Sequence, residues 1–357
     1  MSFDKLIALE YLKYYKEGFA FLKNFVYKLG QTKVKLDEIY LPSKKFFNKV
    51  YRTKRFFPNN YNPKTTKAIL LTHGMSVYGI GDLRILELAY NLCLQGYLVF
   101  IPEFEEVKSL KITFETSENI YDICNIILNL EDLYLKNSLG VLCISFTGGM
   151  GLVALSNTQL LGKVTSILAI GAYSNFDILI QYAVSNFQYD NYASFVFFYN
   201  YIDKVIDKAQ ELKKILLESA IDNALYRYGE DCRSKQMEKY LSKRDKEIYN
   251  SICLNGNFRQ ELAKEICKEL GNLIHIASPI NYIENLVAPV SLIHGKEDKV
   301  IPESESIEIA NVLKKKGKKF NLEITGLLSH GDKVPIWKKA SDVPGLAKAF
   351  GFFLRQI

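Results

Sequence analysis

A serine ends an apolar run in the middle of the chain and is followed by several glycines. Residues 140–151 read GVLCISFTGGMG, with Ser145 where the apolar part stops. Such a run predicts a buried strand, and a polar residue at its carboxyl end lies where α/β proteins place their chemistry. The glycines favour a closely packed helix whose first N–H groups can face a developing negative charge. Ser145 is therefore a candidate nucleophile.

A carboxylate and an imidazole follow Ser145 in the order that this chemistry uses. Asp298 lies in HGKEDKVIP, directly after an apolar run, and His330 lies in TGLLSHGD, just after the next one. Histidine accepts and returns a proton near neutral pH, and a carboxylate fixes its tautomer and stabilises the imidazolium. Taken singly, Asp298 could be a turn residue and His330 a surface residue. Their order at successive strand ends predicts a catalytic triad.

These motifs resemble those of the α/β-hydrolase family. Residues 143–149 are similar to the family's nucleophile elbow, with Cys143 and Thr147 where glycine is usual. HGKEDKVIP is similar to the acid loop, SHG at 329–331 to the histidine loop, and THGM at 72–75 to the oxyanion loop. The resemblance covers residues 67–175 and 285–357.

The resemblance implies an oxyanion hole made by the backbone N–H groups of Met75 and Phe146. His73, in the same loop, is expected to be a buried structural residue, and Asp82 a helix cap. No metal site is expected, because the chain has no His-x-x-x-His pattern or Cys/His cluster. No nucleotide cofactor is expected, because the glycines lack the pattern of a phosphate loop.

The regular part of the chain predicts alternating strands and helices, and hence a mostly parallel sheet flanked by helices. Strands are expected at 68–72, 97–102, 140–144, 164–170, 290–293 and 320–324, and helices at 83–95, 116–135, 148–157, 304–316 and 344–355.

The alternation stops between two late strands. Residues 174–285 contain no comparable apolar run and predict a helical cap, or lid, inserted into a hydrolase core of residues 67–173 and 286–357. Most aromatic residues near 182–201 are expected to form the cap's own core. Residues 1–66 predict a basic extension with a helix at 4–29, and residues 40–66 fit either short strands or an irregular connection.

The net charge of +7 is concentrated near the start of the chain. Residues 1–67 hold 15 Lys and Arg against 5 Asp and Glu. A solvated basic face and peripheral contact with an anionic membrane both fit this segment, and no nucleic-acid-binding module is recognised in it. Six scattered cysteines and the absence of a secretory leader predict a cytoplasmic protein, and a membrane-peripheral one stays an open alternative. The sequence does not indicate an oligomeric state.

The expected function is that of a serine hydrolase. It would cleave carboxylic esters of a small-molecule acyl substrate, including lipid-like acyl esters or thioesters, through an acyl-enzyme. Two alternatives stay open: acyl transfer or cleavage of small peptides by the same triad, and an inactive binding or membrane-associated protein on the same fold.

Overall fold

The computed structural model describes residues 3–24, 33–130, 133–160, 162–328 and 340–357. Eight strands form one sheet in the order β1-β2-β4-β3-β5-β6-β7-β8, in which β2 is antiparallel to β1 and β4 and the remaining pairs are parallel. The strands are β1 (Lys35–Pro42), β2 (Val50–Phe57), β3 (Ala68–Leu71), β4 (Leu98–Pro102), β5 (Leu139–Ile144), β6 (Val164–Ile170), β7 (Val290–Gly295) and β8 (Phe320–Thr325).

Helices cover both faces of the sheet, as the apolar strands require. Every residue of β3 and β4 is buried, which is the pattern of parallel strands with two covered faces. One face packs against α2 (Leu83–Leu94) and α14 (Val343–Gln356). The other packs against α4 (Glu115–Leu128), α5 (Phe146–Leu155) and α13 (Glu303–Lys315). The predicted fold class is confirmed.

The N-terminal segment adds to the core. Of the two alternatives for residues 40–66, short strands are correct, since β1 and β2 form a hairpin that pairs with β4. Part of the extension expected over residues 1–66 therefore belongs to the core sheet. Helix α1 (Phe3–Asn24) lies against α14, where Phe21 is fully buried. The end of the helix expected at 4–29 falls outside the described residues.

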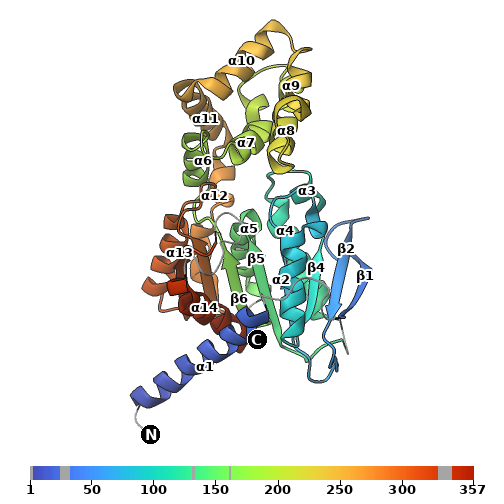
Figure 1. Ribbon diagram of the computed structural model, residues 1–357, viewed down its shortest axis with the longest axis vertical. Coiled ribbons are helices and arrows are strands. Elements are labelled where there is room, and N and C mark those ends of the chain that lie inside the picture. The colour runs from blue at the N-terminus through green and yellow to red at the C-terminus, as the bar shows by residue number, and fades with distance from the viewer. Residues whose placement is uncertain (1–2, 25–32, 131–132, 161, 329–339) are drawn as a thin grey trace.

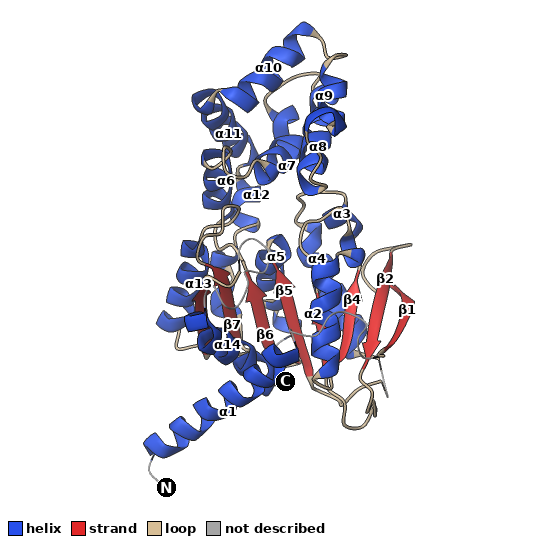
Figure 2. Cartoon of the chain, viewed as in Figure 1, coloured by secondary structure: helices blue, strands red, loops and turns tan. Residues whose placement is uncertain are grey.

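A helical insertion lies above the carboxyl ends of the parallel strands (Figures 1 and 2). It connects β6 to β7, and residues 174–285, all of which the structure describes, contain no strand. Its buried core includes Phe195, Phe197 and Phe198, as expected. Its helices are α6 (Phe176–Ser185), α7 (Tyr192–Tyr201), α8 (Gln210–Ala224), α9 (Arg233–Glu238), α10 (Lys243–Leu254), α11 (Gly256–Leu270) and α12 (Asn272–Ile276).

Candidate active site

Ser145 occupies a strained turn between β5 and α5. Its backbone has φ 58° and ψ −128°, a region that side-chain-bearing residues seldom adopt. The Ser145 N–H donates a hydrogen bond of 2.8 Å to the carbonyl of Ile170 at the end of β6. The strand, the turn and the helix therefore hold the serine at the carboxyl edge of the sheet, as predicted.

Close packing explains the glycines around Ser145. A Cβ on Gly148 would lie 3.0 Å from the Cβ of Ala172, and one on Gly149 would overlap the Tyr173 ring. On the other side of the serine, a Cβ on Gly74 would lie 3.4 Å from the Ser145 Cβ. The oxyanion loop thus passes directly beside the predicted nucleophile.

The two residues that stand where glycine is usual in the elbow both make specific contacts. Cys143 is buried and faces Gly151, where a Cβ would overlap its sulfur. Burial raises the pKa of the Cys143 thiol to about 12, so that the group stays protonated and does not compete as a nucleophile. The Thr147 hydroxyl lies 2.9 Å from the carbonyl oxygen of Ile144 and 2.7 Å from the hydroxyl of Thr72.

His73 has the structural role that the sequence predicts. Its Nδ1 donates to the carbonyl of Gly74 over 2.9 Å, and its Nε2 accepts the N–H of Phe104 over 3.0 Å. The ring is completely buried, and this burial lowers the pKa of His73. A neutral imidazole with both nitrogens engaged fixes the start of the oxyanion loop and is no candidate base.

Asp82 supports the same loop from the next helix. Its carboxylate accepts the N–H of Arg84 at the start of α2, which confirms the predicted cap, and also accepts the hydroxyl of Ser76 over 3.0 Å. Burial alone would raise the pKa of Asp82, but its hydrogen bonds with Arg84 hold that pKa below its usual value. An ionised Asp82 therefore ties the oxyanion loop to α2.

The two predicted oxyanion donors belong to Phe146, which follows Ser145 in the chain, and to Met75, in the loop that passes beside it. Phe146 is the first residue of α5, and an N–H in the first turn of a helix has no acceptor within that helix. Met75 follows Gly74, the residue that packs beside the Ser145 Cβ. These positions fit the predicted oxyanion hole, whose function stays a prediction.

Asp298 lies in the loop after β7 and is almost completely buried. Its Oδ1 accepts the N–H groups of Val300 and Ile301 over 2.8 and 3.0 Å. Its Oδ2 faces Gly171, which follows β6 and has the left-handed backbone, at φ 60°, that glycine favours. The loop therefore fixes the direction in which the carboxylate points.

The buried His294 also approaches this carboxylate, with its Nε2 3.7 Å from Asp298 Oδ2. That Nε2 donates to the carbonyl of Ile301, while Nδ1 lies 2.7 Å from the hydroxyl oxygen of Ser306. His294 therefore stabilises the acid loop. The predicted base, His330, lies outside the described residues, so the triad as a whole stays a prediction.

Sequence reasoning did not single out the cap residues that contact these loops. The hydroxyl of Tyr192 donates to the carbonyl of Met75 over 3.0 Å, and that of Tyr182 to the carbonyl of Asp298 over 2.8 Å. Both acceptors are backbone groups more than 100 positions away in the chain. No residue pattern indicates such bonds, because every residue has a carbonyl.

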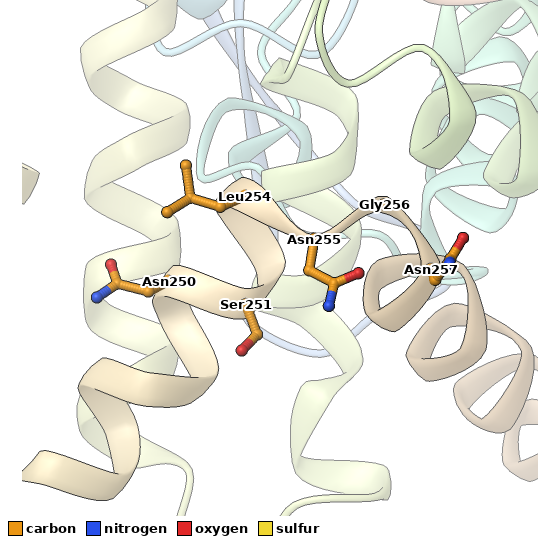
Figure 3. Close-up of a pocket in the computed structure, with 6 residues that line it drawn as sticks. All are labelled: Asn250, Ser251, Leu254, Asn255, Gly256 and Asn257. Carbon is orange, nitrogen blue, oxygen red and sulfur yellow. The ribbon is translucent and has the colours of Figure 1, made fainter.

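A separate surface pocket of about 510 Å³ lies at the turn between α10 and α11 (Figure 3). None of the predicted catalytic residues lines it, so it does not mark the candidate site. The pocket residues are Asn250, Ser251, Leu254, Asn255, Gly256 and Asn257.

Among the described side chains, no group of three or more His, Cys, Asp or Glu residues could hold a metal ion. The helices of the described ranges include none long and apolar enough to span a bilayer.

Comparison with known proteins identifies the fold. No protein-family model and no curated protein matches the sequence. Among solved structures, an acylaminoacyl peptidase of Pyrococcus horikoshii is similar with a TM-score of 0.53 and 17% identity, over 92% of this chain and 42% of that one. Dipeptidyl peptidase 4 of Porphyromonas gingivalis is similar with a TM-score of 0.52 and 10% identity, over 90% and 36%.

This chain therefore spans less than half the length of either peptidase. The low identities carry information about architecture alone. The sheet order, the serine turn and these similarities agree: the chain has the α/β-hydrolase fold.

Proposed function

We propose that the protein is a serine hydrolase that cleaves carboxylic esters, including lipid-like acyl esters and thioesters, with Ser145, His330 and Asp298 as its triad. The observation that carries the proposal is the backbone of Ser145, strained between β5 and α5 with Gly74 packed beside it. Strain of this kind persists where the surrounding structure enforces it, and it is concentrated at functional sites.

In the proposed reaction, Ser145 Oγ attacks the substrate carbonyl carbon while His330 removes the hydroxyl proton. The N–H groups of Met75 and Phe146 stabilise the resulting oxyanion. The bond to the leaving group then breaks, and His330 gives the proton to the departing alcohol or thiol. Water, deprotonated by His330, attacks the acyl-enzyme and releases the acid and the free serine.

A fluorophosphonate probe tests this proposal. We expect one phosphonyl group per chain, attached to Ser145 and located by peptide mass spectrometry. The control variant Ser145→Ala should fold with an unchanged circular dichroism spectrum and remain unlabelled. Folded protein that resists the probe, or equal labelling of Ser145→Ala, contradicts the proposal. Acyl esters of graded chain length would then define the substrate.

Peptide cleavage is the second candidate, supported by the similarity to two peptidases. The same triad would act on an amide, with the leaving amine taking the proton from the base. Parallel assays on acyl-peptide, dipeptide and ester substrates separate the two activities by kcat/KM. Acyl transfer is distinguished by adding a competing alcohol or amine, which a transferase incorporates into its product.

Contact of the N-terminal segment with anionic membranes is a separate proposal. On α1, Leu12 is 63% and Phe19 44% exposed, and Lys13 and Lys16 are also exposed. Apolar side chains flanked by lysines favour an anionic lipid surface. The double variant Lys13→Glu/Lys16→Glu should co-sediment less with phosphatidylserine-containing vesicles than the unmodified chain. Equal co-sedimentation of the two proteins excludes this role of α1.

A further inference from the structure

Among the described residues, four tyrosine hydroxyls connect the cap with the core by donating to backbone carbonyls. Each bond is 2.8 to 3.0 Å long, so the four are alike in type and length. The bonds differ in their acceptors, because two of the acceptor carbonyls belong to loops that carry predicted catalytic groups. The pairs are Tyr173 with Ala277, Tyr182 with Asp298, Tyr192 with Met75, and Tyr201 with Ile112.

The two bonds to the catalytic loops lie on opposite sides of Ser145. Met75 follows β3 and Asp298 follows β7, while Ser145 follows β5, and the sheet order is β3-β5-β6-β7. Residues 182–192 therefore link the loops that flank the nucleophile. Because this segment belongs to the cap, the placement of the cap and the geometry of the site are mechanically connected.

Tyr192 is well suited to this role. Burial raises the pKa of Tyr192, so the hydroxyl is protonated and able to donate near neutral pH. Its acceptor is the carbonyl of Met75, the residue whose N–H is the predicted oxyanion donor. The next residue, Ser76, is held by Asp82 over 3.0 Å. The oxyanion loop is thus fixed by the cap at one residue and by α2 at the next.

Tyr182 has the matching position on the acid loop. Its hydroxyl donates to the Asp298 carbonyl, while the carboxylate of the same residue is held by the N–H groups of Val300 and Ile301. Burial raises the pKa of Tyr182 as well. Nearby, Lys299 lies 5.7 Å from the centre of the Tyr189 ring, a second contact between this cap segment and the acid loop.

We infer that Tyr182 and Tyr192 are positioning residues of the reaction: through their hydroxyls the cap sets the oxyanion donor and the catalytic acid relative to Ser145. This inference rests on the proposed function. Small displacements of catalytic groups cost large factors in rate, and loss of an oxyanion donor costs about 10²–10³ in kcat. Loosening a donor by one hydrogen bond is expected to cost less, about tenfold.

The test compares Tyr→Phe variants of the full chain, with Tyr201→Phe as the matched control. Each variant keeps its ring and loses one hydroxyl bond between cap and core. We expect Tyr192→Phe and Tyr182→Phe to lower kcat about tenfold with little change in KM, and to slow fluorophosphonate labelling by a similar factor. Tyr201→Phe should lose similar thermal stability and keep its kcat.

The outcomes separate this inference from the function on which it rests. Full kcat in both Tyr192→Phe and Tyr182→Phe, with Ser145 still labelled, overturns the positioning role and leaves the hydrolase intact. An equal loss of kcat in Tyr201→Phe also overturns it, because general loosening of the cap would then suffice. Failure to label Ser145 in the unmodified chain overturns both. Should Tyr192→Phe unfold, the partly exposed Tyr182 decides the matter alone.

Discussion

The hydroxyls of Thr147 and Thr72 lie 2.7 Å apart and join the first turn of α5 to the chain leaving β3. Thr147 stands where the nucleophile elbow of α/β-hydrolases usually has glycine. Its hydroxyl also contacts the carbonyl oxygens of Ile144 and His73. The substitution of glycine by threonine thus connects the nucleophile turn to the oxyanion loop. The elbow of this chain is held together by a buried side chain as well as by close backbone packing.

Thr147→Val should therefore weaken both stability and activity. Valine has nearly the same shape but no hydroxyl, so buried partners of Thr147 lose a hydrogen bond, at a cost of about 1–3 kcal/mol in the free energy of unfolding. Urea denaturation measures this cost, and ester hydrolysis measures kcat. In the control, Thr165→Val, the lost bond to the Leu139 carbonyl lies at the other end of β5, and kcat should stay unchanged. An equal effect of both variants on kcat contradicts the prediction.

Asp298→Asn should abolish most activity while keeping the acid loop folded. The amide oxygen can still accept the N–H groups of Val300 and Ile301, but an amide cannot stabilise an imidazolium or fix its tautomer. We expect kcat to fall by about 10⁴, the size of effect seen when the acid of such a triad is neutralised.

The control for this prediction is Asp222→Asn in the cap. Asp222 is also a buried carboxylate that accepts backbone N–H groups, from Arg233 and Ser234. Both variants should lower the thermal midpoint, and Asp298→Asn alone should lower kcat. A fully active Asp298→Asn would remove Asp298 from the proposed triad.

Because α1 packs closely against α14, we expect a larger side chain at Gly351 to lower the stability of the fold. A Cβ on Gly351 would overlap the backbone carbonyl of Tyr14, which cannot move without shifting α1. Gly351→Ala should lower the free energy of unfolding by about 1–3 kcal/mol, as overpacking typically does. Gly81→Ala is the control, because no atom lies within 4 Å of its added Cβ. Equal denaturation midpoints for the two variants would show that the helices do not pack this way.

The sequence was informative where chemistry and strand ends coincide. Ser145 and Asp298 can be predicted as candidate site residues because each follows an apolar run, and parallel strands bring their carboxyl ends to one edge. The hairpin of β1 and β2 could not be settled in the same way. Strand β1 lies at the edge of the sheet and is mostly exposed, so it lacks the continuous apolar run of a buried strand. The hydrogen bonds of Tyr182 and Tyr192 could not be predicted from the sequence, because their acceptors are backbone carbonyls.

Glu323 makes stability depend on pH near neutrality. It lies on β8, and its carboxylate faces Gly345 of α14, where a Cβ would overlap it. Burial, together with the nearby Asp342 carboxylate, raises the pKa of Glu323 from 4.5 to about 7, although Lys348 acts in the opposite direction. The unfolded chain ionises this group more readily than the folded chain does. Stability that is present below about pH 4.5 is therefore lost as the pH rises to about 7.

Glu323→Gln should remove this dependence, because a glutamine side chain does not ionise. At pH 8 the variant should be more stable than the unmodified chain, by about 1 kcal/mol once the partial exposure of the group is allowed for. At pH 4.5 the two should be nearly equal. Thermal denaturation from pH 4.5 to 8 measures the difference, with Glu308→Gln on the exposed face of α13 as the control. Parallel stability curves for Glu323→Gln and the unmodified chain would mean that the fold does not raise the pKa of Glu323.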